Sequence, residues 1–209
     1  VCEIVRDSWG STGTFACPLS IFGHQLPTEL GRAVVEARGG AVRSRRARAR
    51  RGLLIGAVSG ASSMLALWGF TVDDAWITAR VAHHLATGIG HRFNVDGPVV
   101  DAVTPLGYAH LLAAFAGTGP LGAFAAARFL GALAWLAAAA WLGRTIFLGG
   151  QRPLRLAPLL LLAISVPIGA WTTSGMETGL VTLLATLALA PHPWAPLAAG
   201  LAAAWRPEL

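Results

Sequence analysis

The chain has 209 residues, of which 55% are hydrophobic and only 12% are charged. Soluble domains carry charge on roughly a quarter of their residues, so this composition argues against an ordinary soluble domain. All 16 basic residues are arginines, and eight of them lie between Arg32 and Arg51, which explains most of the formal net charge of +6. A basic tract beside an apolar run indicates the cytoplasmic flank of a membrane span more than a nucleic-acid site, so no nucleic-acid partner is expected.

Residues 1–40 mix Gly, Pro, Ser and Thr with scattered charges and show no sustained hydrophobic period, although Leu30–Arg38 is compatible with a short helix. A dense arginine cluster follows at Arg43–Arg51. We therefore expect residues 1–52 to be a poorly ordered basic segment on the cytoplasmic side. Cys2 and Cys17, the two cysteines, both lie there, so neither a disulfide framework nor a cysteine-based metal site is predicted. The chain begins with valine and stops just after an apolar run, and we expect a fragment of a longer protein.

Apolar runs dominate the chain after the basic block. Five are predicted as membrane spans, at residues 53–70, 121–142, 156–171, 179–190 and 194–205. The predicted fold is all-α: a polytopic membrane helical bundle over residues 53–209, multi-pass in the cell (cytoplasmic) membrane. Two prolines inside the third run are compatible with this prediction, because membrane helices tolerate proline.

Residues 71–120 form the polar segment between the first two predicted spans, and they hold four of the ten acids. A surface helix is predicted at about 73–87, where three apolar residues recur every four positions: Ile77, Val81 and Leu85. Such a stripe suits a helix lying on the membrane surface. A second apolar stretch, at about 106–118, is short for a span, so we expect it to lie along the membrane.

The arginines after the second span set the orientation. If 106–118 crossed the membrane, the span 121–142 would run outward and would leave Arg144, Arg152 and Arg155 outside, against the positive-inside rule. With 106–118 on the surface, these arginines are cytoplasmic. The turn at 172–178 then faces the same outer side as the polar segment.

Two adjacent acids, Asp73 and Asp74, stand where the chain leaves the first span. Thr71-x-x-Asp74 matches a capping signature, so one interpretation is a helix start stabilised by its acids. In a helix that begins at Asp73, Arg80 and His84 fall on the same face, with Arg80 about 10 Å away. The other interpretation is then catalytic: the acid takes a proton from a hydroxyl, and the arginine stabilises a phosphate.

Glu177 is the only acid between Asp101 and Glu208, and it lies between two apolar runs. An ionisable group at a membrane edge is a candidate functional residue, and a solvated acid at a helix start is the structural alternative. The histidines of the polar segment match no zinc-ligand spacing, so no zinc site is predicted. Arg128, inside the second span, is expected to reach a lipid phosphate or an acid, or to snorkel.

Three groups of residues, taken in their order along the chain, form a pattern. The first comprises Asp73-Asp74-Ala-Trp-Ile-Thr-Ala-Arg80, Gly88-Ile-Gly90-His-Arg-Phe93-Asn94 and Val103-Thr104-Pro105-Leu106. The second is Ser174-Gly-Met-Glu177, and the third is Trp205-Arg206-Pro207-Glu208. Over about 53–209 this pattern resembles the membrane-embedded, inverting GT-C glycosyltransferases that use polyprenyl-phosphate sugars, in the branch of arabinofuranosyltransferases and protein mannosyltransferase-like enzymes.

The resemblance implies transfer of a sugar from a polyprenyl-phosphate donor to a hydroxyl of a glycan, lipid or protein acceptor on the outer face, in cell-wall or envelope glycan synthesis. Asp73 or Asp74 is then the catalytic base. Four residues are predicted to bind substrates: Arg80, His84, Glu177 and Arg206. Some members of the family use a divalent cation, and Mg²⁺ or Mn²⁺ would take oxygen ligands from Asp73, Asp74 and Glu177.

Two other functions stay open on the sequence. One is a truncated, catalytically inactive membrane protein or lipid-binding scaffold, since the GT-C family has more spans and further donor-binding elements. The other is a transporter segment with an acid–histidine relay, in which proton-coupled uptake depends on Glu177.

Overall fold

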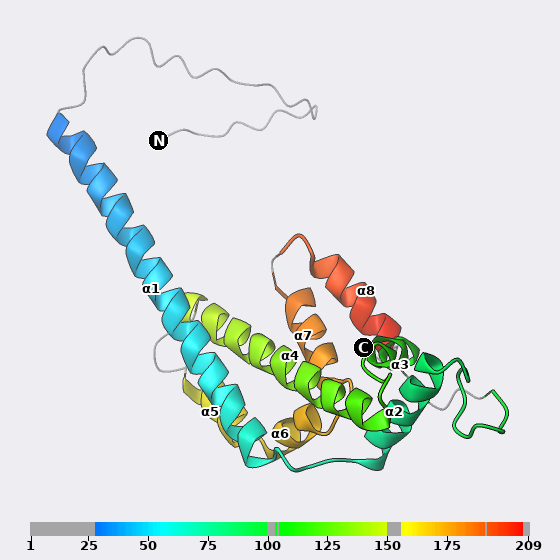
Figure 1. Cartoon of the computed structure of the whole chain (residues 1–209). Coiled ribbons are helices and arrows are strands. Elements are labelled where there is room, and N and C mark those ends of the chain that lie inside the picture. Colours follow the sequence, from blue (N-terminus) through cyan, green and yellow to red (C-terminus); the bar gives the residue numbers. More distant parts are fainter. Residues whose placement is uncertain (1–27, 100–102, 104, 150–155, 191, 207–209) are drawn as a thin grey trace, which may run out of the picture. The chain divides into compact units, whose positions relative to one another are not determined.

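The structure is a computed structural model that describes residues 28–99, 103, 105–149, 156–190 and 192–206 (Figure 1). The described residues form eight helices and no strand, which confirms the predicted all-α class for this part of the chain. The chain divides into two units, Val1–Val42 and Arg43–Leu209. All the residues predicted to form the functional site belong to the second unit. The helices are α1 (Thr28–Ala66), α2 (Asp73–Ala86), α3 (Leu106–Ala113), α4 (Pro120–Gly149), α5 (Leu156–Ile164), α6 (Val166–Thr173), α7 (Thr178–Ala188) and α8 (Ala195–Trp205).

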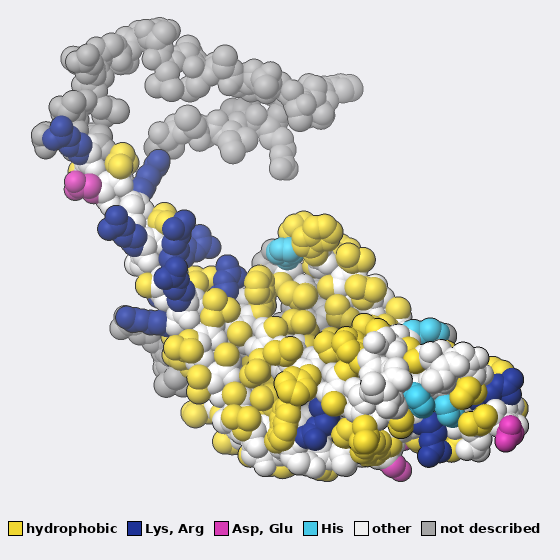
Figure 2. Space-filling view, in the orientation of Figure 1, with side chains coloured by type: hydrophobic (Ala, Val, Ile, Leu, Met, Phe, Trp, Pro, Cys, Tyr) yellow, Lys and Arg dark blue, Asp and Glu magenta, His cyan; other side chains and the backbone are white. Residues whose placement is uncertain are grey.

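The N-terminal part of α1 corrects the expectation of a poorly ordered segment at 1–52. Residues 28–52 are helical, because their alanines and arginines have high helix propensity. Residues 1–27 lie outside the described residues. The predicted span 53–70 is helical only as far as Ala66. In Figure 2, arginines gather along the N-terminal half of α1, whereas hydrophobic side chains cover much of the visible face of the other helices.

α4 is the helix against which much of the second unit packs, since it contacts α2, α3, α6 and α7. It has 30 residues and contains the predicted span 121–142. At 1.5 Å per residue it is about 45 Å long, more than the ~30 Å of membrane hydrocarbon. Among the described residues, α4 is the one helix long and apolar enough to cross a membrane.

α1 and α4 meet through glycines. A Cβ added to Gly52 would lie 2.6 Å from the carbonyl oxygen of Gly143, and one added to Gly56 would also strike the backbone of α4. Trp135 Nε1 donates a hydrogen bond to the carbonyl oxygen of Gly60 (3.0 Å). The two helices are therefore antiparallel, with their backbones as close as those of membrane helices packed through small residues.

The predicted span 156–171 is two helices, α5 and α6, separated by Ser165. Pro167 lies in the first turn of α6. Proline has no N–H to donate and its ring clashes with the preceding turn, so the chain starts a new helix here instead of continuing the old one.

The last two predicted spans, 179–190 and 194–205, correspond to α7 and α8. Each helix has 11 residues, about 16 Å of length. They pack against each other. Glu177, at the start of α7, pairs with Arg206, at the end of α8, so the two helices run antiparallel and their open end is closed by an ion pair.

α2 and α3 occupy the two predicted surface helices, although α3 ends at Ala113. The apolar stripe of α2, predicted to lie on the membrane surface, packs inside the protein at Val81, which is fully buried against Val103 and Ala109. Ile77 and Leu85 are partly buried against the same cluster. The opposite side of α2 contributes three alanines to a core shared with α3 and α4: Ala75, Ala79 and Ala82.

Candidate functional site

The turn between α6 and α7 carries Glu177 and is built around a glycine. Gly175 has φ +94°, a backbone conformation that side chains rarely adopt. A Cβ at this position would lie 2.9 Å from the ring of Phe124 and 3.1 Å from the Cβ of Ala75. Only glycine therefore fits both the conformation and the space, and the turn lies tightly against α2 and α4.

Three successive carbonyl oxygens of this turn accept hydrogen bonds from side chains of three other segments. The donor–acceptor pairs are Arg128 Nε with Thr173 O (3.0 Å), Thr71 Oγ1 with Ser174 O (3.4 Å) and Tyr108 OH with Gly175 O (3.2 Å). Outside a helix, buried backbone carbonyls need such donors. Together α4, the link before α2, and α3 fix the turn and hence the position of Glu177.

Arg128 is partly buried, lies over aromatic rings and forms no ion pair with an acid of the described residues. Its guanidinium carbon is 4.8 Å from the ring centroid of Trp68 and 5.8 Å from that of Phe124. These distances are those of cation–π contacts, which stabilise a desolvated arginine. With its bond to Thr173, Arg128 connects the predicted span to the turn.

Glu177 has a fully buried side chain. Its Oε1 pairs with Nη2 of Arg206, whose side chain is 32% exposed. The contact is ionic, since neither carboxylate oxygen accepts a hydrogen bond from the described residues. Burying a carboxylate is very unfavourable without a cationic partner. Glu177 therefore depends on Arg206, and its second oxygen keeps an unused acceptor.

Tyr108 lies close to this carboxylate and is fully buried. Burial, followed by the negative charge of Glu177, raises the pKa of the Tyr108 hydroxyl well above its ordinary value. The phenol therefore stays protonated and keeps donating to the carbonyl of Gly175.

Asp74, Glu177 and Arg206 line one cavity of about 180 Å³, which we call the acid cavity. Its other lining residues are Ile77, Thr78, Val103, Pro105 and Met176. The two acids come from the first turn of α2 and the N-terminal end of α7, more than a hundred residues apart in sequence. The structure thus brings together three of the predicted site residues.

The predicted capping signature at the start of α2 is absent. The N-cap residue is Val72, which has no polar side chain to cap the helix, and the hydroxyl of Thr71, one residue earlier, donates to the carbonyl of Ser174. Asp73 Oδ1 accepts the N–H of Asp74 (3.1 Å). The carboxylate of Asp74 has no hydrogen bond or ion pair with any described residue, and it stays available at the acid cavity.

Asp73 and Arg80 line a second cavity, of about 260 Å³, which we call the aromatic cavity. Trp76, Ile77, Phe93 and Pro120 complete its lining. Neighbouring residues of an α-helix point about 100° apart, so the two adjacent acids serve different cavities. Ile77 lines both, which places the two cavities on either side of one residue.

His84 is not brought to either cavity. Its ring Nδ1–H donates to the carbonyl of Arg92 (2.8 Å), and the side chain is buried. Its own carbonyl accepts the N–H groups of Ile89 and Gly90. In this structure His84 closes the turn that follows α2.

A larger groove, of about 400 Å³, runs along α7 and ends at Arg206. Two threonines on this face donate their hydroxyls to carbonyls one turn earlier, Thr182 to Thr178 and Thr186 to Thr182 (2.7 Å each). The groove therefore presents mainly methyl groups. Arg206 borders both this groove and the acid cavity.

The three acids considered as ligands for Mg²⁺ or Mn²⁺ do not meet at one point. Asp73 lies at the aromatic cavity, and among the described residues no three His, Cys, Asp or Glu side chains are grouped so that they could hold a metal ion. Binding of a divalent cation by Asp74 and Glu177 stays a prediction.

Sequence reasoning passed over Trp76 and Tyr108. Trp76 stands three residues after Asp73 and four before Arg80, so the helical period already places the three on one face. Tyr108 gave no such signal, because its contact with Gly175 depends on the tertiary structure. Comparisons of this chain with protein-family models, curated proteins and solved structures gave no match.

Proposed function

We propose that this chain is part of a GT-C type, inverting glycosyltransferase that moves a sugar from a polyprenyl phosphate to an acceptor hydroxyl at the outer face of the cytoplasmic membrane. One observation carries the proposal. Asp74, Glu177 and Arg206, which are distant in sequence, line one small cavity beside an apolar groove that ends at the same arginine.

A multi-pass membrane location is supported by α4 and by its glycine-mediated contact with α1. Gly52, which follows the basic block, lies against Gly143 and Arg144 near the other end of the antiparallel pair. The positive-inside rule assigns this arginine-rich end to the cytoplasm. The opposite end, beside Asp74 and Glu177, then faces outward.

The groove along α7 suits the isoprenoid chain of the donor, because its walls are methyl groups and aliphatic side chains. Arg206 stands where the chain would end, and a guanidinium recognises phosphate through paired hydrogen bonds. The sugar attached to that phosphate would then enter the acid cavity. Glu177 holds the guanidinium from the buried side.

In this arrangement Asp74 accepts the proton of the acceptor hydroxyl while its oxygen attacks the anomeric carbon. The bond from that carbon to the phosphate oxygen breaks, and its electron pair leaves with the phosphate. Arg206 stabilises the negative charge that develops there. Attack on the face opposite the leaving phosphate inverts the anomeric carbon.

The test is sugar transfer by membranes that carry the protein, supplied with radiolabelled polyprenyl-phosphate sugars. Loss of a general base lowers the rate by about 10²- to 10⁴-fold, so Asp74→Asn should lose transfer while inserting normally. Asp96→Asn is the matched control, because Asp96 is an exposed acid of the same segment that lines neither cavity. Near-normal transfer by Asp74→Asn would remove Asp74 from the role of base.

Orientation has its own test in a variant with both cysteines replaced by serine. A membrane-impermeant thiol reagent added from outside should label Asp96→Cys and leave Gly149→Cys unlabelled. Labelling of Gly149→Cys from outside would reverse the proposed topology of α4.

A further inference from the structure

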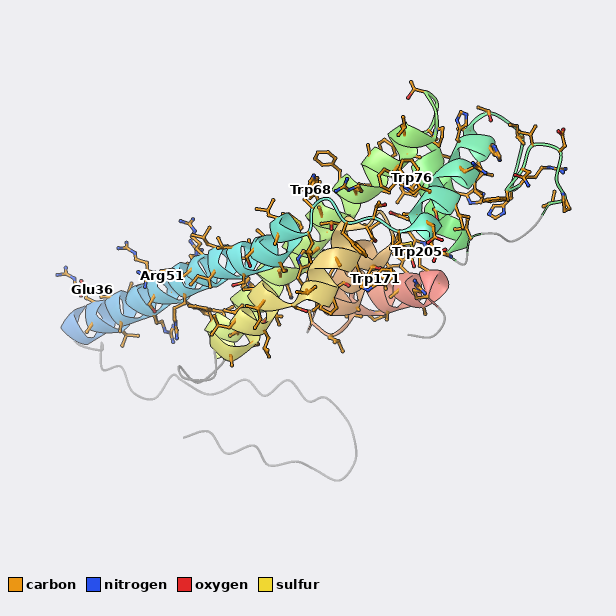
Figure 3. The ribbon with its side chains drawn as sticks, turned by 90° about the horizontal axis from the view of Figure 1, so that it is seen from below. Glu36, Arg51, Trp68, Trp76, Trp171 and Trp205 are labelled. Carbon is orange, nitrogen blue, oxygen red and sulfur yellow. The ribbon has the colours of Figure 1, made fainter. Side chains whose placement is uncertain are left out.

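The aromatic cavity presents a rigid, exposed indole. Trp76, labelled in Figure 3, is 39% exposed. One face of its ring is stacked on Phe124, with centroids 4.1 Å apart and planes inclined by 14°. The stack holds the ring in place, and the indole still lines the cavity. Cavities with aromatic walls and a few polar groups are typical of sites for small organic ligands.

The polar groups at the edges of this indole have opposite charges. Asp73 precedes Trp76 by three residues and Arg80 follows it by four, so both side chains border the ring on one helix face. The guanidinium of Arg80 lies over Phe93, 5.0 Å from the ring centroid, and is ion-paired with no described carboxylate. The cavity thus offers a hydrogen-bond acceptor and several donors around an aromatic face.

This combination fits a sugar ring. The C–H face of a sugar is attracted to the negative face of an aromatic ring, and its hydroxyls both donate and accept hydrogen bonds. The opposite charges of Asp73 and Arg80 favour a neutral ligand over an anion or a cation. A hydrocarbon tail would cover both charged groups without pairing either, which is unfavourable.

We propose that the aromatic cavity binds a saccharide unit of the acceptor, so that one helix, α2, separates two sugar sites. Ile77 lines both cavities, so a sugar on Trp76 lies next to the acid cavity, where Asp74 is in reach of its hydroxyl. The term acceptor rests on the proposed function, whereas saccharide binding at Trp76 does not.

The experiment measures binding without transfer. The protein in lipid nanodiscs is titrated with octyl glycosides of arabinofuranose, mannose and glucose, and saturation-transfer NMR and Kd are recorded. Tetraethylene glycol monooctyl ether, which has the same chain and no sugar ring, is the ligand control. Trp76→Ala should weaken at least one glycoside about tenfold, and Trp76→Phe, which keeps a ring, should retain most of the affinity.

Trp171→Ala is the protein control, because Trp171 is similarly exposed (43%) and does not line the aromatic cavity. The proposal is overturned if Trp76→Ala binds as tightly as the parent, or if Trp171→Ala loses as much. If Trp76→Ala lost equal affinity for the glycosides and for the glycol ether, the proposal would also be overturned. That result would mean that Trp76 binds the alkyl chain and not the sugar.

Failure of the proposed function gives a different result. Trp76-dependent glycoside binding by a protein that transfers no sugar would support the saccharide site and contradict the glycosyltransferase. Sugar transfer with no glycoside binding would contradict the saccharide site alone.

Discussion

Two of the contacts that α4 makes are of opposite kinds. Against α1 it meets glycines, and the contact is close because Gly52 and Gly56 have no side chains. Against the turn between α6 and α7 it supplies Phe124, which encloses Gly175, and Arg128, which donates to the backbone.

The difference follows from the backbone of each partner. α1 satisfies its own backbone hydrogen bonds, so the contact relies mainly on close packing, with one added hydrogen bond from Trp135 to Gly60. The turn leaves the helical hydrogen-bond pattern, and its carbonyls need donors from Arg128, Thr71 and Tyr108. The polar network is therefore gathered where the chain is irregular, and this is where the buried Glu177 lies.

The packing contact should be the more sensitive to added volume. A Cβ at Gly56 already strikes the backbone of Ala139, so Gly56→Leu should separate α1 from α4 and destabilise the protein by about 4 kcal/mol. Gly200→Leu is the control, since nothing lies within 4 Å of a Cβ at that position on α8. Thermal unfolding in nanodiscs measures both, and equal Tm values would show that the α1–α4 contact is loose.

The ion pair next to the turn should be the most sensitive polar element. Arg206→Gln leaves the carboxylate of Glu177 buried without a cation, which should destabilise the protein by about 3 kcal/mol. The double variant with Glu177→Gln should recover much of that loss. Arg51→Gln, at an exposed arginine of α1, should change the unfolding free energy very little. No recovery in the double variant would contradict a dependence of Glu177 on Arg206.

Gly175→Ala tests the conformation of the turn itself. The left-handed backbone and the contact with Phe124 should together destabilise the protein by about 2 kcal/mol and lower transfer by displacing Glu177. Gly117→Ala, at an open loop position without positive φ, serves for comparison. A Gly175→Ala protein with unchanged stability would mean that the turn relaxes without loss.

Tyr108→Phe should have the smallest effect, about 1 kcal/mol, because it removes one neutral hydrogen bond to Gly175. The folded protein has the higher tyrosine pKa, so the hydroxyl contributes fully below the unfolded pKa of about 10 and its contribution falls above it. Chemical unfolding at several pH values should therefore show a constant difference near neutrality that shrinks in strong alkali. A difference that grows with alkaline pH would contradict the raised pKa.

The helices predicted best from the sequence were those with a long or regular apolar pattern. α2 begins at Asp73 as predicted, and α4 contains the whole of 121–142. Of the helix at 28–52, only a short stretch at Leu30–Arg38 was anticipated, because a search for hydrophobic period overlooks helices made of alanine and arginine. The break at Ser165 was missed because proline was judged only by its tolerance in membranes.

The candidate site was predicted in part. Reasoning from the arginines placed the turn at 172–178 on the side of Asp74, and the structure brings Glu177 and Asp74 to one cavity. His84 follows Arg80 by one turn of α2 but does not line the aromatic cavity, because its ring donates to the carbonyl of Arg92 in the loop after α2. Long-range hydrogen bonds of this kind leave no periodic trace in a sequence.

The shared wall at Ile77 has a consequence for how specificity changes over time. Asp73 and Asp74 are neighbours in the chain yet border separate chambers, so substitutions around Trp76 and Arg80 can alter one chamber without touching the other. If the proposed function holds, such substitutions would change which acceptor is bound and leave the donor site unchanged. A rotation of α2 about its axis would change both cavities at once, because Asp73 and Asp74 point about 100° apart on the same helix.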